Sequence, residues 1–200
     1  MLLTLKQVRQ VVDQHVPKPM VEMAHADHAA VACILKGEET PEVLLIRRTE
    51  VPGDPWSGHM AFPGGRTEPG DPDLLATAVR ETGEEVGVDL AAQAELLGRL
   101  DDLQAMAGGH SINLIIRPFV FWLRKASPLT LNEEVAEALW APLAPLARGD
   151  ADTIRPYRFQ GQTLDLPAYR VGPHVVWGLT YRMLRSLFAL TAGTPDAQRL

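Results

Sequence analysis

Apolar residues recur along this chain at two spacings, one typical of helices and the other of strands. Positions three or four apart are apolar in several segments, which predicts amphipathic helices there. Short apolar or alternating runs, bounded by glycine, proline and polar residues, predict strands. The predicted helices are residues 4–15, 72–86, Pro142–Arg148 and Trp177–Leu190. The predicted strands are Ala29–Leu35, Val43–Ile46, Leu96–Leu100, Ile112–Leu123, Glu137–Ala141, Tyr157–Phe159 and Thr163–Leu166.

Strands mixed with helices in this order fit an α/β/α sandwich, in which a mixed sheet lies between helices. Neither an internal repeat nor a linker interrupts the sequence, so residues 1–200 are expected to form a single domain. Within it we expect an N-terminal helical arm at residues 1–20 and a frayed tail at residues 193–200. The segments Thr49–Met60 and Gln104–Gly109 are predicted loops.

Composition limits the class of protein. With 200 residues, 46% of them hydrophobic, the chain can bury a sizeable core. A formal net charge of −6 argues against nucleic acid as a partner. Because there is neither a stretch that spans a bilayer nor an apolar signal region, we expect a cytoplasmic protein without a membrane partner. The single cysteine, Cys33, lies in an apolar run and is expected in the core.

Three glutamates stand out from this pattern because they share one face of a predicted helix. Glu81, Glu84 and Glu85 stand at i, i+3 and i+4. Like charges grouped in this way repel, whereas a hard divalent cation bound to their oxygens would turn repulsion into coordination. The alternative is a solvated acidic face on a surface helix, but it leaves the Gly64-Gly65 pair before the helix unexplained.

The stretch Arg80-Glu81-Thr82-Gly83-Glu84-Glu85-Val86-Gly87-Val88, with Phe62-Pro63-Gly64-Gly65 before it, closely resembles the Nudix box. That box is written G-x5-E-x7-R-E-U-x-E-E-x-G-U, where U is a bulky aliphatic residue. The second half matches position for position apart from Thr82. Counted from Gly65, the first box glutamate becomes Asp71, and eight residues rather than seven separate it from Arg80. Asp71 is therefore expected to cap the helix rather than to bind metal.

Further patches resemble the coenzyme A pyrophosphatase branch of the same family. The first is Ser57–Gly65, similar to its H-P-G-Q-I-S-F-P-G-G, and Glu68–Asp71 and Thr77–Glu81 continue the similarity. The second is Val176–Thr180, similar to a tryptophan-glycine-x-threonine that opens the closing helix in that branch. The branch's leading L-L-T-x-R-S is only half present, as Leu44–Thr49. The resemblance implies the same α/β/α fold.

The resemblance also implies a metal-dependent hydrolase that cuts the pyrophosphate bond of a nucleoside diphosphate linked to another group. Glu81, Glu84 and Glu85 would hold Mg²⁺ or Mn²⁺, since these cations prefer oxygen ligands. Gly65 would add a backbone ligand, and Arg80 would orient a glutamate through a charge-assisted bond. The cation would neutralise phosphate oxygens and acidify a water.

Residues outside the box supply candidates for the substrate site and for a base. Arg47, Arg48 and Arg66 flank the box and could bind phosphate, although each alone is more typical of a surface charge. Trp56, in the long loop, fits either an anchor for that loop or a stacking platform for a base. A general base could be a box glutamate or one of two loop carboxylates, for which a solvated turn is an equal alternative. These two are Glu133 and Glu134.

Substrate and class both keep alternatives at this stage. The preferred substrate is coenzyme A or its thioesters, cut to 3′,5′-ADP and 4′-phosphopantetheine. Within the family, ADP-ribose, dinucleoside polyphosphates and (d)NTPs are the alternatives. A non-catalytic nucleotide-sensing module is the alternative of another class, and it is disfavoured because such modules tend to lose box glutamates. The expected partner is a small molecule, and the expected assembly is a monomer or homodimer.

Overall fold

A computed structural model describes residues 3–20, 26–107 and 109–192. Its helices are α1 (Leu5–Gln14), α2 (Leu74–Val86), α3 (Leu90–Gln93), α4 (Leu143–Arg148) and α5 (Gly178–Ala192). Its strands are β1 (Asp27–Lys36), β2 (Glu42–Arg48), β3 (Met60–Ala61), β4 (Gly64–Arg66), β5 (Ala94–Arg99), β6 (Leu103–Ala107), β7 (His110–Leu123), β8 (Val135–Pro142), β9 (Asp152–Phe159), β10 (Gln162–Val171) and β11 (His174–Trp177). Within these described ranges, no helix combines the length and the apolar character that crossing a membrane requires. The predicted tail at residues 193–200 lies outside the described residues.

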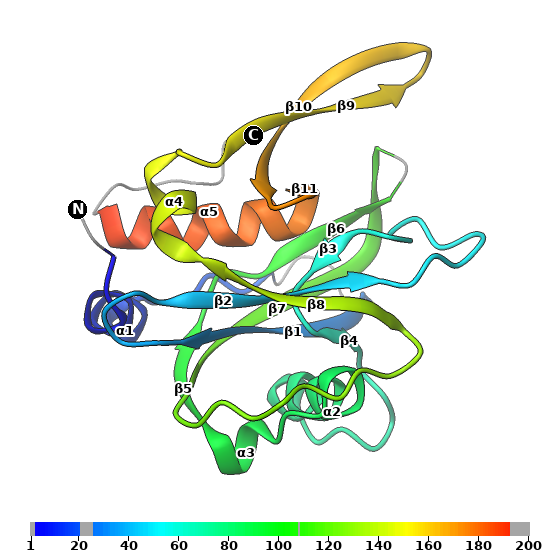
Figure 1. Ribbon diagram of the computed structural model, residues 1–200. Helices are drawn as coiled ribbons and strands as arrows, with labels where there is room; N and C mark the ends of the chain where they lie inside the picture. Colours follow the sequence, from blue (N-terminus) through cyan, green and yellow to red (C-terminus); the bar gives the residue numbers. More distant parts are fainter. Residues whose placement is uncertain (1–2, 21–25, 108, 193–200) are drawn as a thin grey trace.

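Eight strands form one mixed sheet around β1. β1 runs parallel to β7 and antiparallel to β2 and β4. The strands follow the order β3-β2-β1-β7-β5, and β8 pairs with β2 while β6 pairs with β7. A second sheet, in the order β11-β10-β9, carries the long β9–β10 hairpin. Figure 1 shows that hairpin extending away from the main body.

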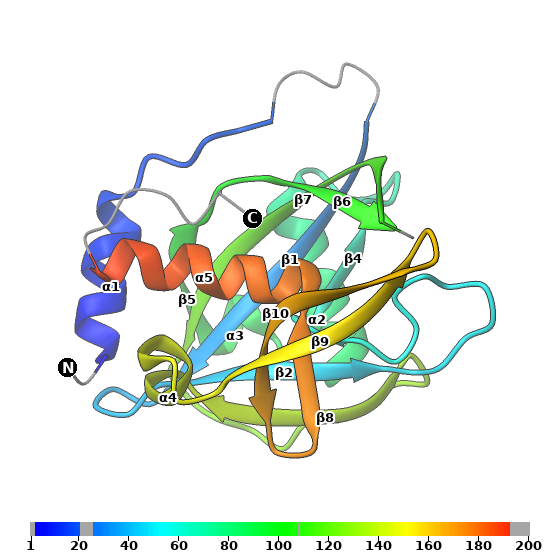
Figure 2. The ribbon, with the colours of Figure 1, turned by 90° about the horizontal axis from the view of Figure 1, so that it is seen from above.

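Alternate residues of β1 face two different cores. Cys33 and Leu35 pack with residues of α1 and α5, whereas Ala32 and Ile34 pack with residues of α2. Figures 1 and 2 show α5 crossing one face of the sheet, with α2 and α3 on the opposite face. The predicted α/β/α sandwich with a mixed sheet is confirmed. The predicted burial of the free Cys33 is confirmed as well.

The N-terminal helix α1 is a packing element. A capping box begins it, since the Thr4 side chain accepts from the Gln7 amide and the Gln7 side chain accepts from the Thr4 amide at 2.9 Å. Leu5, Val8 and Val12 are buried. The helix contacts α5 and β5, so the predicted N-terminal arm lies against the body.

Two regions are more regular than the sequence pattern predicted. The predicted loop at Gln104–Gly109 is wrong, because β6 occupies Leu103–Ala107 and pairs with β7. Pairing with a long neighbouring strand outweighs a weak local pattern. β9 and β10 have 8 and 10 residues, where only short strands were predicted, and each is paired along its length with the other.

A buried carboxylate, Asp102, joins three segments of the chain. Its side chain is 1% exposed. Arg117 donates to both carboxylate oxygens at 2.8 Å, and Arg99 and the Met20 amide donate to it as well. Burial raises the pKa of Asp102, but these donors outweigh burial and leave the pKa below its ordinary value. The bond from the Met20 amide thereby holds the segment before β1 to the sheet.

Asp102→Asn is expected to lower the free energy of unfolding at neutral pH by about 2 kcal/mol, because it removes the charge that faces Arg117. The folded-state pKa is lowered, so this stabilisation is present above the unfolded pKa. It is lost as the pH falls through the folded value. Urea unfolding of both proteins at neutral pH and at about pH 3 measures the difference.

An exposed ion pair provides the control for this prediction. Asp150→Asn breaks a pair with Arg148 in which both side chains are exposed, and it should change the free energy of unfolding by less than about 1 kcal/mol. A loss for Asp102→Asn no larger than the control's, or the same loss at both pH values, would contradict the expected role of the charge.

Candidate active site

Helix α2 is capped by Asp73 and not, as predicted, by Asp71. The Asp73 side chain accepts from the Ala76 amide at 2.8 Å. Asp71 lies two residues before the cap and bonds to Arg80 instead. The predicted end of the helix is confirmed, since Gly87 is in the left-handed region with φ of 69°.

Glu85 is the buried member of the three carboxylates on α2. It is 1% exposed, and its Oε2 accepts from the Gly64 amide at 2.8 Å. Burial raises the pKa of Glu85 to about 8; the Gly64 amide and Arg48 oppose that rise, whereas Glu81 and Glu134 add to it. Glu85 therefore holds a proton near neutral pH, and a bound cation would displace that proton.

Glu81 packs against the backbone of Gly65. A Cβ atom at that glycine would lie 2.3 Å from Glu81 Oε1, so any other residue would collide with the carboxylate. Burial raises the pKa of Glu81, and the charge of Arg80 opposes the rise. The two glycines are therefore explained separately. Gly64 has a φ of 145° and lies against the backbone of β1, and Gly65 leaves room for the Glu81 carboxylate.

Arg80 links the helix carboxylates to the turn before α2. Its Nη1 donates to Glu84 at 3.0 Å and lies 3.2 Å from Glu81 Oε1. Its Nε and Nη2 donate to the two oxygens of Asp71, each at 3.0 Å, and Nη2 also donates to the Arg66 carbonyl at 3.1 Å. These bonds hold the pKa of Asp71 well below its usual range. The structure therefore brings Arg80 to a glutamate, as predicted, with Asp71 fixing the other edge of the guanidinium.

The donor set suits a hard divalent cation, and Gly65 leaves a place for the Glu81 carboxylate that a larger residue would fill. Across the described ranges, no three His, Cys, Asp or Glu side chains already converge on a single point where a metal could bind. Arg80 Nη1 lies 3.2 Å from Glu81 Oε1 and 3.0 Å from Glu84 Oε2. A cation would have to compete with this guanidinium for both carboxylates. Metal binding by the glutamates and by the Gly65 carbonyl stays a prediction.

Each of the three arginines predicted to bind substrate already faces a carboxylate. The ion pairs are Arg47–Glu137 at 3.6 Å, Arg48–Asp54 at 2.9 Å and Arg66–Asp27 at 3.0 Å. One donor of Arg48 is unpartnered, since its Nε is buried without a hydrogen-bond partner among the residues described. The positive charge of Arg48 also opposes the rise in the pKa of Glu85. Their predicted role in substrate binding remains a prediction.

Trp56 anchors the long loop that precedes β3. Its Nε1 donates to the Met106 carbonyl at 3.2 Å, and its ring packs with a small cluster that includes Ala105 and Ile116. Of the two alternatives left by the sequence, an anchor or a stacking platform, the structure supports the anchor.

The two loop carboxylates proposed as a base differ in what they face. Both are exposed, and Thr49 is bonded to the backbone carbonyls of both Glu133 and Glu134 at 2.8 Å. The charge of Glu134 raises the pKa of Glu81 and Glu85, after the larger effect of burial. Glu134 is therefore the better placed of the two, and its role as a base stays a prediction.

The two patches that resemble the coenzyme A branch lie against each other. The ring centroids of His59 and Trp177 are 4.7 Å apart. The buried Thr180 hydroxyl donates to the Met60 carbonyl at 3.0 Å. Residues more than a hundred positions apart in the sequence therefore pack against each other.

Arg155 and Tyr157 join these contacts, although nothing in the sequence pattern indicated that they would. The Arg155 guanidinium lies over the Trp177 ring, 4.7 Å from its centroid, and the Tyr157 ring lies 5.5 Å from it. Their positions two apart on a strand place them on one face. This alternation along the strand was the only sequence signal that could have grouped the two residues. It could not be used, because the predicted strand, Tyr157–Phe159, stopped short of Arg155.

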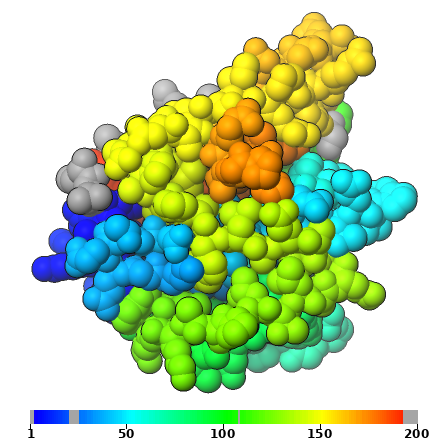
Figure 3. All heavy atoms as spheres, in the orientation of Figure 1, coloured from blue at the N-terminus to red at the C-terminus, as the bar shows by residue number. Residues whose placement is uncertain are grey.

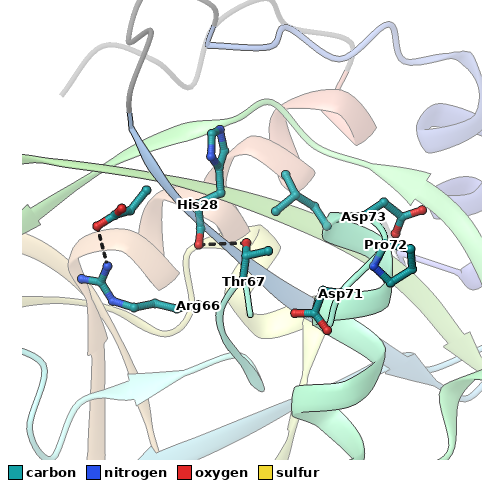
Figure 4. A pocket seen from close by; sticks show the side chains of 8 residues that line it. His28, Arg66, Thr67, Asp71, Pro72 and Asp73 are labelled. Carbon is teal, nitrogen blue, oxygen red and sulfur yellow. Dashed lines mark hydrogen bonds and ion pairs between the residues drawn. The ribbon is translucent and has the colours of Figure 1, made fainter. Parts of the chain in front are cut away.

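A pocket of about 660 Å³ opens beside the start of α2. Its lining residues are Asp27, His28, Arg66, Thr67, Asp71, Pro72, Asp73 and Leu74. Figure 4 shows Arg66 turned toward a carboxylate, that of Asp27, and Thr67 turned toward the carbonyl of His28. The glutamates of α2 do not line it, so the pocket is a neighbour of the carboxylate face rather than the same site.

Comparison with known proteins decides which family has this arrangement. The family model described as the NUDIX domain matches residues 26–159, which is more than half of the chain. The chain belongs to the Nudix family. The glutamates of α2, the glycine pair and Arg80 all lie inside the matched region, so the family predicted from the box is confirmed.

Relatives of this Nudix chain come from several kingdoms. An uncharacterized protein of Schizosaccharomyces pombe, C14C4.10c, is 43% identical over 116 residues, which are 56% of this chain and 35% of that protein. The uncharacterized Nudix hydrolase NudL of Photorhabdus laumondii is 31% identical over 166 residues, covering 80% of this chain and 82% of NudL. The human mitochondrial coenzyme A diphosphatase NUDT8 is 32% identical over 152 residues, covering 74% of this chain and 61% of NUDT8. This chain thus spans about a third of the yeast protein and under two thirds of the human one.

Solved structures support the Nudix fold. A MutT/nudix family protein from Enterococcus faecalis superposes with a TM-score of 0.53 and 14% identity, covering 96% of this chain and 82% of that one. A C. elegans Ap4A hydrolase in a binary complex gives 0.51 and 22% identity, covering 61% of this chain and 84% of that one.

Proposed function

We propose that this Nudix protein is a metal-dependent pyrophosphohydrolase. The observation that carries the proposal is the set of three carboxylates on α2, with Gly64 bonded to Glu85 and Gly65 packed against Glu81. A Mg²⁺ or Mn²⁺ ion held by Glu81, Glu84 and Glu85 would neutralise phosphate oxygens and acidify a water.

The protein's own groups would fix the geometry of this site. The Gly64 amide holds one oxygen of Glu85, and Arg80 holds Glu84 in turn. The charge of Glu134 acts on Glu81 and Glu85, and its carboxylate could accept a proton from the attacking water. In the reaction, water adds to one phosphorus, the bond from phosphorus to the bridging oxygen breaks, and two monophosphates leave.

We propose further that the diphosphate belongs to coenzyme A or its thioesters, so that the products are 3′,5′-ADP and 4′-phosphopantetheine. Two observations support this substrate. The human relative at 32% identity is named a mitochondrial coenzyme A diphosphatase. The two patches that resemble the coenzyme A branch are in contact through His59 and Trp177.

A substrate panel tests the proposed substrate. Coenzyme A should be cut with a kcat/KM about ten- to a hundredfold above that for dephospho-coenzyme A, because a charge-assisted contact to the 3′-phosphate is lost. Equal values would mean that the 3′-phosphate is not recognised. Cleavage of ADP-ribose, dinucleoside polyphosphates or (d)NTPs without cleavage of coenzyme A would overturn the substrate and leave the pyrophosphohydrolase. Binding of nucleotides with hydrolysis of none would support a sensing module instead.

Asp71→Asn is expected to raise the concentration of cation needed for half-maximal activity by about tenfold. Freed from the Asp71 carboxylate, Arg80 would pair more strongly with Glu81 and Glu84 and compete with the cation for them. Activity measured against free Mg²⁺ gives the value. Asp73→Asn is the matched control and should change little, since asparagine caps a helix about as well as aspartate. An unchanged cation requirement in Asp71→Asn, or an equal shift in both variants, would contradict this role of Asp71.

A further inference from the structure

The β9–β10 hairpin turns one face toward the body of the protein. Alternate residues of β9 make the contacts, with Arg155 and Tyr157 against Trp177 and Phe159 against His110 at 5.4 Å. Figure 3 shows the hairpin, yellow to gold, standing out above the cyan loop at residues 49–58. The hairpin therefore presents its inner face beside that loop.

A series of contacts connects this inner face to the carboxylates of α2. Trp177 touches His59, and the His59 carbonyl accepts from the Arg48 amide at 3.0 Å. The positive charge of the Arg48 side chain favours the ionised form of Glu85. Burial lowers the pKa of His59, and the charge of Arg155 adds to that effect. Contacts thus run from the hairpin face to Arg48, whose charge acts on the carboxylate of Glu85.

Arg155 differs in its partner from the arginines near the box. Arg47 and Arg48 each face a carboxylate, whereas no carboxylate within the described part of the chain lies within 4.0 Å of the exposed Arg155. The contact with Trp177 places the Arg155 guanidinium over the ring, and its N–H groups have no carboxylate partner among the residues described. That planar fork matches the oxygens of a phosphate.

We propose that Arg155, stacked on Trp177, binds a phosphomonoester of the substrate that is remote from the diphosphate, such as the 3′-phosphate of coenzyme A. The inference rests on the proposed function, and it assigns phosphate recognition to the hairpin rather than to the paired Arg47 and Arg66. Arg155 is a binding residue in this account and takes no part in bond cleavage.

The test compares two arginines of one strand in the full-length protein. Arg155→Gln removes the inner guanidinium, and Arg158→Gln is the matched control, because Arg158 lies opposite Thr163 on the outer face of the hairpin. The wild-type preference in kcat/KM for coenzyme A over dephospho-coenzyme A, about tenfold or more, should fall to near unity in Arg155→Gln and persist in Arg158→Gln. An unchanged preference in Arg155→Gln, or an equal loss in both variants, would overturn the inference.

Binding of products separates this inference from the proposed function. In calorimetric titrations of wild-type protein, 3′,5′-ADP should bind about tenfold more tightly than 5′-AMP, and Arg155→Gln should remove the difference. Equal affinities of the wild type for the two nucleotides would overturn the inference even if coenzyme A is hydrolysed. Hydrolysis of no diphosphate by the wild type would contradict the proposed function, and the titrations would still decide the role of Arg155.

Discussion

Glu85→Gln is expected to lower kcat for diphosphate hydrolysis by a hundredfold or more, equivalent to about 3 kcal/mol of transition-state stabilisation. Glutamine keeps an oxygen that can accept from the Gly64 amide, so the fold should survive. Glutamine at position 85 lacks the negative charge that binds a cation. Glu81 and Glu84 cannot supply that charge at the position of residue 85. Steady-state kinetics with Mg²⁺ in excess measure the loss, and Glu84→Gln should behave in the same way.

A nearby exposed carboxylate serves as the control. Glu68 lies 3.8 Å from Arg80, and its side chain is 65% exposed. Glu68→Gln should leave kcat within about twofold, since an exposed pair of this length contributes little. Thermal unfolding of each variant shows whether it is folded. Full activity in both Glu84→Gln and Glu85→Gln would exclude these carboxylates from the reaction.

Gly64→Ala is expected to destabilise the protein by about 3 kcal/mol or more. The φ of Gly64 is 145°, and a Cβ there would lie 2.3 Å from the Ala30 carbonyl oxygen and 2.5 Å from the Val31 Cα. Both atoms belong to the backbone of the central strand β1, which cannot move aside. A shift of Gly64 would also withdraw the amide that holds Glu85, so activity should fall with stability.

Gly70 is the matched glycine in the turn that follows β4. Nothing lies within 4 Å of a Cβ at Gly70, and its φ is not in the left-handed region. Gly70→Ala should therefore change the free energy of unfolding by less than about 1 kcal/mol. Urea unfolding of the two variants gives the comparison. Similar losses in the free energy of unfolding would show that the close approach of β1 does not explain the glycine at position 64.

The elements that the sequence predicted best are those with a strong local pattern. The apolar run of β1 predicts its strand, and the glutamate spacing on α2 predicts a shared face, because each is a property of one element. The glycine pair was also informative, since a Cβ at Gly64 would collide with the backbone of Ala30 and one at Gly65 would displace the Glu81 carboxylate. The family follows from these features together.

What the sequence could not supply is the choice of partner for each charged side chain. Aspartate is a common capping residue, which is why Asp71 was expected to cap α2. The extra residue in the turn places Asp73 at the cap instead, and Asp71 accepts a hydrogen bond from Arg80. Arg47 and Arg66 are near the box in sequence and yet face carboxylates of other strands. Such pairings depend on tertiary neighbours, which local spacing does not encode.

The dependence of hydrolysis on a divalent cation tests the central claim most directly. Wild-type protein would be incubated with coenzyme A and Mg²⁺ or Mn²⁺, with and without excess chelator, and the products separated by chromatography. The account predicts two monophosphate products with either cation, none with chelator, and recovery when the cation is restored. Cleavage at an undiminished rate in excess chelator would contradict it.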